Sequence, residues 1–363
     1  MNSPQANRHI RGKAVALLLA VPVFIILSEL ILWIVPLDLS FQNRFFLVNR
    51  ALDYPEVFKK DHDLFWRFRP SQTIRSDFFE GKTYRINDHG LRGEDIRPKS
   101  DRLRIIALGN SCTFGWGVSN ENTFIERLEN IIDDDPDMPT VETINAGIPG
   151  YSSFQGRRFF VSDILPLEAD IVLIMFAWND QWAAADNIPD KDQRMPAPSL
   201  IAVQNTVSRL AVYRLMKRII LSAVEEPLDE KLRRENPVYR VGVVDFYENL
   251  NVIVYQCRQQ GILPILLTSP IPALEKYYPP GSRSPMHRYH ADYNYQIRLI
   301  ARNHKAPLID LAAEFDRYDD LFDDAPRDPI HFNRRGHEIA AETIYRFLEA
   351  GMDSLDIRSR PGK

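Results

Sequence analysis

Residues 104–115 read RIIALGNSCTFG, and this stretch decides the fold that we expect for the chain. The run RIIAL is mostly apolar, which is typical of a strand buried on both faces, as in a parallel sheet. It leads directly into a turn that contains Gly109 and Ser111. Ligands of open α/β sheets bind beyond the carboxyl ends of the strands. A serine at this position can therefore expose its hydroxyl group to a bound ligand. Taken alone, the stretch also fits a serine that merely caps a helix.

Outward from this strand, apolar runs and helical patterns alternate along the chain. The further runs expected to form strands are residues 141–146, 170–177, 262–269 and 306–311, and the helical patterns are residues 123–132, 246–260, 289–304 and 335–348. This alternation predicts an α/β fold, a doubly wound, flavodoxin-like parallel sheet of five strands with helices on both faces. We place this domain at residues 101–350, followed by a C-terminal tail at residues 351–363.

Residues 181–240 interrupt this rhythm, and we expect them to form an insertion. Residues 186–198 are polar and rich in proline, which predicts a loop. Residues 206–223 have helical spacing and carry several arginine and lysine side chains. We interpret this helix as a cover over the active-site side of the domain, with a membrane-surface or acyl-binding role as the alternative.

The N-terminal part contains the most apolar stretch of the chain. Residues 14–37 have one ionisable side chain, that of Glu29, and they follow Arg8, Arg11 and Lys13. A helix rising ~1.5 Å per residue over this length can cross a ~30 Å hydrocarbon core. The positive-inside rule then predicts residues 1–13 in the cytoplasm, a single-pass anchor in the inner (cytoplasmic) membrane, and a periplasmic or extracellular main domain.

Two alternatives to the anchor are a cleaved signal peptide and a buried core helix. Residues 38–100, between the anchor and the domain, are interpreted as an N-terminal extension of unknown role that packs on the domain.

The composition excludes several classes of function. The chain has 363 residues and a formal net charge of −4, which does not indicate a nucleic-acid-binding protein. Its two cysteines cannot build a disulfide framework or a zinc-ligand cluster. The histidines outside the motifs lack the spacing of metal ligands: His287, His290, His304 and His337. We therefore expect no metal and no cofactor, and the oligomeric state stays unknown.

Three more segments place reactive groups at the ends of predicted strands. GIPGYS at residues 147–152 can aim a backbone N–H at the crevice, AWND at residues 177–180 supplies an asparagine amide, and DPIHFN at residues 328–333 lies in the final loop. An aspartate three residues before a histidine can fix the tautomer of the imidazole, so that the other ring nitrogen faces a serine. Each segment alone fits an ordinary loop, but together they converge on one edge of a doubly wound sheet.

The segments GNSCTFG, NAGIPG, AWND and DPIH resemble the signature blocks of the SGNH/GDSL hydrolase family, over about residues 102–348. The resemblance implies that Ser111 is the nucleophile of a serine esterase and that His331 is its general base and later its general acid. It implies that Asp328 orients His331. It further implies an oxyanion hole formed by the N–H groups of Ser111 and Gly150 and the side-chain amide of Asn179.

Two positions depart from the family pattern. Asn110 stands where the family usually has aspartate, and Ala177 where it usually has glycine. An amide is isosteric with a carboxyl group, so we expect the turn around Ser111 to survive, whereas a methyl group at position 177 narrows the pocket. Cys112 is interpreted as a small buried residue and not as a second nucleophile, and a disulfide with Cys257 is not favoured.

These features predict a membrane-anchored serine esterase that works outside the cytoplasm through a Ser111 acyl ester. Its first-choice substrate is an O-acyl ester, above all an O-acetyl ester, of an envelope glycan. Its expected partners are an acylated carbohydrate or lipid and, through the N-terminal helix, the membrane. The alternatives are an O-acyltransferase, a lipid esterase or thioesterase on the same site, and a catalytically silent glycan-binding or assembly protein on the same fold.

Overall fold

The core of the molecule is a five-stranded parallel sheet, in a computed structural model that describes residues 4–35, 54–75, 81–184, 187–224, 238–272 and 285–357. Its strand order is β6-β5-β7-β8-β9, with every neighbouring pair parallel. The strands are β5 (Leu103–Gly109), β6 (Val141–Gly147), β7 (Ile171–Met175), β8 (Leu263–Leu267) and β9 (Leu308–Ile309). The order 2-1-3-4-5 is that of a doubly wound, flavodoxin-like fold, so the predicted five-stranded parallel sheet is confirmed.

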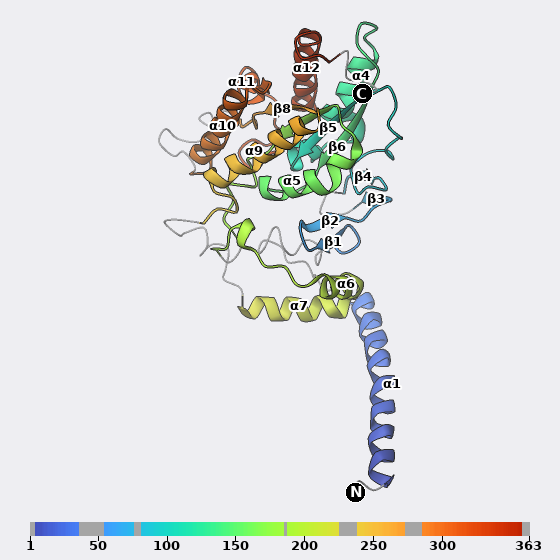
Figure 1. The fold of residues 1–363 in the computed structure, drawn as a ribbon. Helices are drawn as coiled ribbons and strands as arrows, with labels where there is room; N and C mark the ends of the chain where they lie inside the picture. The colour runs from blue at the N-terminus through green and yellow to red at the C-terminus, as the bar shows by residue number, and fades with distance from the viewer. Residues whose placement is uncertain are drawn as a thin grey trace.

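Helices cover both faces of this sheet (Figure 1). One face packs against α4 (Phe124–Asp133), α11 (Leu311–Phe315) and α12 (Arg334–Ala350). The other packs against α5 (Ser153–Phe159), α9 (Val243–Gln259) and α10 (Pro285–His304). The side chains of β5 alternate between the two cores, with Ile105 in the first and Ile106 in the second. This two-residue period, with a core on each face, explains why residues 105–108 of the run are all apolar.

Short helical segments connect these layers. After β5 come α3 (Ser111–Phe114) and the 3₁₀ turn η2 (Asn120–Asn122). The chain leaves α5 through a π turn, η3 (Phe160–Ile164), and a 3₁₀ turn, η4 (Leu165–Leu167). A further 3₁₀ turn, η6 (Asp190–Asp192), lies within the segment predicted as a loop.

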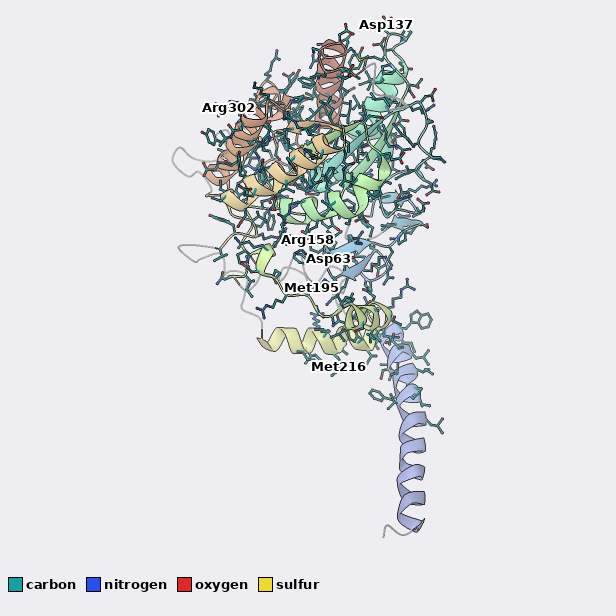
Figure 2. The ribbon with its side chains drawn as sticks, viewed as in Figure 1. Asp63, Asp137, Arg158, Met195, Met216 and Arg302 are labelled. Atoms are coloured by element: carbon teal, nitrogen blue, oxygen red, sulfur yellow. The ribbon has the colours of Figure 1, made fainter. Side chains whose placement is uncertain are left out.

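The insertion contains two helices where the sequence predicted one over residues 206–223. They are α6 (Pro198–Val207) and α7 (Ala211–Val224). A contact from another part of the chain caps the second helix, where the carboxylate of Glu29 accepts hydrogen bonds from Ala211 N at 2.9 Å and Val212 N at 2.8 Å. These are N–H groups of the first turn of α7, which have no acceptor within the helix, so a distant carboxylate stabilises its start. Met216 on α7 is 53% exposed (Figure 2).

The segment before the domain forms two antiparallel hairpins that the sequence pattern did not predict in full. They consist of β1 (Phe58–Asp61) with β2 (Phe65–Phe68), and β3 (Gln72–Arg75) with β4 (Thr83–Ile86). Only β4 has a local signal, because residues 84–93, YRINDHGLRG, are typical of a short strand that enters a glycine-containing turn. The aromatic side chains of these hairpins join the core under α5, and Tyr151 Oη donates to Trp66 O at 2.7 Å. The hairpins therefore share a hydrophobic core with the sheet.

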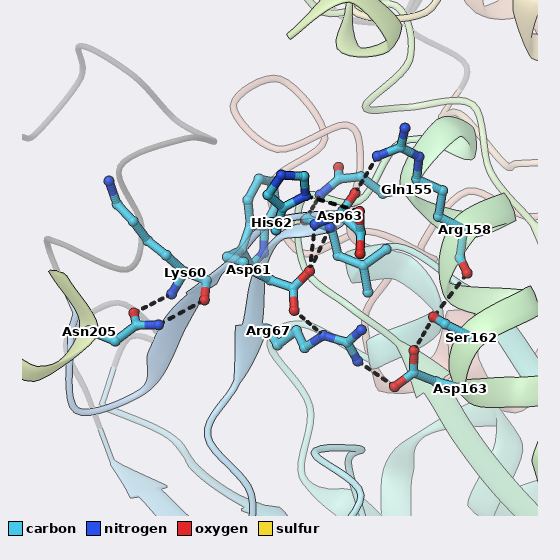
Figure 3. A network of polar contacts seen from close by, with 12 residues as sticks. Lys60, Asp61, His62, Asp63, Arg67, Gln155, Arg158, Ser162, Asp163 and Asn205 are labelled. Atoms are coloured by element: carbon cyan, nitrogen blue, oxygen red, sulfur yellow. Dashed lines mark hydrogen bonds and ion pairs between the residues drawn. The ribbon is translucent and has the colours of Figure 1, made fainter. Parts of the chain in front are cut away.

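Polar contacts tie the first hairpin to two other parts of the molecule (Figure 3). Asn205 of α6 pairs with the backbone of Lys60, accepting from its N at 2.7 Å and donating to its O at 2.9 Å. Arg67 bridges Asp61, at 2.6 Å, and Asp163 of η3. The insertion thus contacts the hairpin, and the hairpin contacts the layer that covers the sheet.

The N-terminal helix α1 (Pro4–Ile34) extends away from the domain and contacts α7 (Figure 1). Apolar side chains on its described part are exposed, among them Phe24 at 66% and Trp33 at 83%. Within the described ranges, however, no helix combines the length and the apolar character that crossing a membrane requires. The anchor predicted over residues 14–37 is therefore not supported by the structure, and its last two positions lie outside the described residues.

Candidate active site

Ser111 lies at the first position of a one-turn helix directly after β5. Asn110 caps this helix, because its Oδ1 accepts from Cys112 N at 3.0 Å. The strand must pass close to its neighbour here, since a Cβ on Gly109 would stand 2.6 Å from Met175 O. Asn110 thus supplies the acceptor that an aspartate would supply, while its buried Nδ2 has no hydrogen-bond partner. The turn keeps its form with an amide in place of the carboxylate.

His331 lies between Ser111 and Asp328, within hydrogen-bond distance of both. Its Nε2 is 2.8 Å from Ser111 Oγ, and its Nδ1 is 2.7 Å from Asp328 Oδ2. All three come from elements that end or begin at the carboxyl edge of the sheet, with His331 just before α12. The arrangement lets the serine hydroxyl donate to one ring nitrogen while the other donates to the carboxylate.

The carboxylate of Asp328 is held by more than the imidazole. Its Oδ1 accepts from the backbone N–H groups of Ile330 and His331, each at 3.1 Å. Burial opposes the charge, but these bonds and the His331 ring outweigh it and lower the pKa of Asp328 below its ordinary value. Asp328 is therefore a carboxylate at neutral pH, in a position to stabilise an imidazolium.

Gly150 and Asn179 flank this group on the two neighbouring strands. Gly150 follows β6, in a tight turn where Tyr151 N donates to Ile148 O at 3.1 Å. Its φ of 85° is a conformation that glycine adopts without strain. Asn179 follows β7, is 5% exposed, and donates from Nδ2 to Tyr151 O at 3.0 Å. Because β6 and β7 both neighbour β5, the structure brings these donors to the same edge as Ser111.

Ala177 has an unusual backbone conformation, with a φ of 137°. Non-glycine residues rarely adopt a φ in this range, because the Cβ crowds the backbone. The position is where the resemblance leads one to expect glycine, and the side chain is fully buried. The strain at Ala177 also ends β7 two residues earlier than the predicted run.

Three residues next to the site were not found from the sequence. Trp116 stacks on the ring of His331, with centroids 5.5 Å apart. Arg92, from the segment before the domain, donates to Phe114 O at 2.6 Å and Gly115 O at 2.7 Å, carbonyls at the end of α3. The third, Arg240, donates to the carbonyl oxygens of Gly150 and Asn179. These contacts join residues far apart in sequence, and no local motif signals them.

Asp180, next to Asn179, is a buried carboxyl group. Its Oδ1 accepts from Ser153 N at 2.8 Å, and its Oδ2 is buried without a hydrogen-bond partner. Burial raises its pKa from 3.8 to about 7, although the contacts with Ser153 and the charge of Arg240 act in the opposite direction. This carboxyl group changes charge near neutral pH.

The other candidate groups have structural roles. Cys112 Sγ donates to Ile330 O at 3.3 Å, and burial, with the charge of Asp328, raises the pKa of its thiol well above the ordinary value. Cys112 and Cys257 are both buried and free. His337 Nδ1 accepts from Phe124 N at 3.1 Å, and burial keeps its pKa well below 6.5. Cys112 is thus a thiol and His337 a neutral imidazole.

Metal ligands are the last class of candidate. In the part of the chain that the structure describes, no group of three or more His, Cys, Asp or Glu side chains could hold a metal ion. His290 Nε2 instead lies 2.8 Å from Ser269 O, and His304 Nε2 lies 2.5 Å from Asn251 Oδ1. The side chain of His287 lies outside the described residues.

The sequence matches one protein family over the part of the chain that contains these residues. A profile of the GDSL-like lipase/acylhydrolase family matches residues 107–339. Among solved structures, the chain is similar to a lipase/acylhydrolase from Enterococcus faecalis, at 19% identity over 68% of this chain and 95% of that chain, with a TM-score of 0.45. It is also similar to an acetylxylan esterase from Geobacillus stearothermophilus, at 15% identity over 69% and 95%, with a TM-score of 0.44. None of the curated proteins matches the sequence.

Proposed function

The chain belongs to the GDSL-like lipase/acylhydrolase family and is a carboxylic ester hydrolase, and from this premise we propose that Ser111, His331 and Asp328 form its catalytic triad. The observation that carries the proposal is the position of His331, 2.8 Å from Ser111 Oγ on one side and 2.7 Å from Asp328 Oδ2 on the other. We assign the oxyanion hole to the N–H groups of Ser111 and Gly150 and the side-chain amide of Asn179.

In the first half-reaction, Ser111 Oγ attacks the ester carbonyl while its proton passes to Nε2 of His331. The resulting oxyanion accepts hydrogen bonds from the N–H groups of Ser111 and Gly150 and from the Asn179 amide, which has a second N–H besides the one given to Tyr151. Asp328, already a carboxylate, stabilises the imidazolium. His331 then gives the proton to the leaving alkoxide, which departs as an alcohol and leaves an acyl ester on Ser111.

In the second half-reaction, water takes the place of the alcohol. His331 accepts a proton from the water, whose oxygen attacks the acyl carbonyl, and returns it to Ser111 Oγ as the carboxylic acid leaves. Transfer to a sugar hydroxyl differs only in the group that attacks the acyl enzyme. We propose hydrolysis, in keeping with the family.

For the substrate, we propose an O-acetyl ester of an envelope glycan. Its support is Trp116, a half-buried residue whose ring stacks on that of His331 with 22° between the ring planes, so that aromatic surface, the kind that packs against sugar rings, lies next to the histidine. The test is hydrolysis of a series of nitrophenyl esters by the full chain, with mass spectrometry of the acid released from O-acetylated envelope polysaccharide. We expect acetate release and a preference for the shortest acyl chains, both absent in Ser111→Ala. A preference for long acyl chains contradicts the glycan substrate and favours a lipid ester.

The site of action is a separate proposal, that the domain lies outside the cytoplasm and is held at the inner membrane by its N-terminal segment. Its support is the sequence of residues 14–37 and the basic residues Arg8, Arg11 and Lys13 before them. A reporter enzyme fused after Lys363 should be active only in the periplasm. Activity of the same fusion in the cytoplasm overturns this topology and leaves the proposed chemistry untouched.

A further inference from the structure

Arg240 is a buried arginine at the end of the insertion, 2% exposed, and all three of its guanidinium nitrogens have partners. Nη1 donates to the carbonyl oxygens of Gly150, at 2.8 Å, and of Asn179, at 3.4 Å. Nη2 donates to Gln155 Oε1 at 2.8 Å. The charge is balanced by Asp190, whose two carboxylate oxygens lie 3.1 Å from Nε and 2.8 Å from Nη2. The guanidinium thus touches both residues that we assign to the oxyanion hole beside Ser111.

We propose that Arg240 is a positioning residue that holds the two separate halves of the oxyanion hole at their working distance. This inference rests on the proposed function. Gly150 follows β6 and Asn179 follows β7, and β5 lies between these strands. No strand pairing therefore fixes one loop relative to the other. The loops are joined by two side-chain bonds, from Asn179 Nδ2 to Tyr151 O and from Ser153 N to Asp180 Oδ1, and by the guanidinium of Arg240. The planar guanidinium presents its donors in a fixed geometry, so one side chain can set the spacing of two carbonyl groups.

The surroundings hold Arg240 itself in place. Ser152, the N-cap of α5, donates from Oγ to Asp190 Oδ2 at 2.6 Å. On the backbone, Asp190 N donates to Arg240 O at 2.8 Å and Arg240 N donates to Trp182 O at 2.8 Å. Asp190 and Arg240 therefore form an ion pair within the insertion, and the same guanidinium also donates to the loops of Gly150 and Asn179. The insertion thereby has a function. It places the ion pair of Asp190 and Arg240 against the carbonyl groups of Gly150 and Asn179.

The charge of Arg240 contributes a second, measurable effect. It lowers the pKa of the buried Asp180 carboxyl group, whereas the negative charge of Asp190 raises this pKa. Val241 N also donates to Asp180 O at 3.1 Å, so the loop after β7 is attached to the segment of Arg240 at two points. Removal of the guanidinium should therefore raise the pKa of Asp180 further, in addition to releasing the two carbonyl groups.

The test compares Arg240→Met and Arg240→Lys with a matched control, Arg104→Met. Arg104 is 3% exposed and donates to two backbone carbonyls, Leu167 O at 2.5 Å and Arg97 O at 2.6 Å, and to Glu142 at 2.9 Å. It has the same kind of environment as Arg240 but lies at the amino end of β5, away from Ser111. Arg240→Met and Arg104→Met should both lower the free energy of unfolding, but only Arg240→Met should lower the stabilisation of the oxyanion.

Activity is measured well below the unfolding temperature of each variant. We expect Arg240→Met to lower kcat about 10²-fold, the loss typical of one oxyanion donor, with KM nearly unchanged. Arg240→Lys keeps the charge but cannot bridge both carbonyls, so it should fall between wild type and Arg240→Met. Because the lysine variant retains a cation beside Asp190, it keeps the test open if the methionine variant does not fold. Arg104→Met should keep the wild-type kcat in its folded fraction.

Equal kcat values for Arg240→Met and Arg104→Met, or a rise in KM with kcat unchanged, overturn the inference. If Arg240→Lys folds and Arg240→Met does not, a wild-type kcat for Arg240→Lys also overturns the inference. These outcomes differ from failure of the proposed function, in which wild type itself shows no hydrolysis beyond that of Ser111→Ala.

Discussion

The buried carboxyl group of Asp180 makes the stability of the protein depend on pH. In the folded protein its pKa is about 7, because burial disfavours the charge, against an ordinary value of 3.8. Between these two values the folded state holds a proton that the unfolded state has lost. The free energy of unfolding must therefore fall as the pH rises from about 4 to about 7, and this group causes no further change above that range.

The size of the effect follows from the two pKa values. At about 1.4 kcal/mol for each pH unit, the gap between 3.8 and about 7 corresponds to roughly 4 kcal/mol. Asp180→Asn removes the titration while it retains the shape of the side chain and the oxygen that accepts from Ser153 N. Between about pH 5 and about pH 8, wild type should lose roughly 3 kcal/mol more stability than Asp180→Asn.

Urea unfolding of both proteins at the two pH values measures this difference directly. Other groups that titrate in this range, such as the buried His337, are common to both proteins and cancel in the comparison. If the two proteins lose the same stability between the two pH values, Asp180 is not the buried titrating group that the structure indicates, and the reasoning is wrong.

Three further predictions concern the site and its supporting turns. Asp328→Asn should lower kcat by about 10³-fold or more, because an amide cannot stabilise the imidazolium of His331 and can select the wrong tautomer of its ring. Steady-state hydrolysis of a nitrophenyl ester measures the loss, and a kcat near that of wild type contradicts the triad. Asn179→Ala should lower kcat by about 10²–10³-fold with little change in KM, and a change confined to KM would show that Asn179 only binds substrate. Gly147→Ala should lower the free energy of unfolding by at least about 3 kcal/mol, because its Cβ would stand 2.1 Å from Phe114 N. Gly242→Ala, with nothing within 4 Å of its Cβ, is the control, and equal urea midpoints for the two variants refute the steric argument.

The sheet and the residues at its carboxyl edge could be predicted because their signals are local. Strands buried on both faces read as apolar runs, and the reactive side chains follow those runs within a few residues, as Ser111 follows β5. The strand ends were less accurate. β9 covers only Leu308–Ile309 of a predicted run over residues 306–311, and the positive φ of Ala177 shortens the third strand.

The elements that the sequence did not indicate depend on distant contacts. The strands β1 to β3 have four residues each, too few for a clear period, and packing against the main core holds them. The start of α7 is capped by Glu29, far away in the chain. Arg92 and Arg240 are buried cations that donate to backbone carbonyls of other segments, and backbone partners leave no trace in a sequence motif.

The nucleophile is the central claim, and chemical labelling tests it most directly. Full-length protein treated with a fluorophosphonate probe is digested, and the modified peptide is identified by mass spectrometry. We predict a single adduct on Ser111 Oγ, no adduct in Ser111→Ala, and much slower labelling in His331→Ala, which lacks the general base. Absence of an adduct in wild type, or an adduct at another residue that persists in Ser111→Ala, would contradict the account.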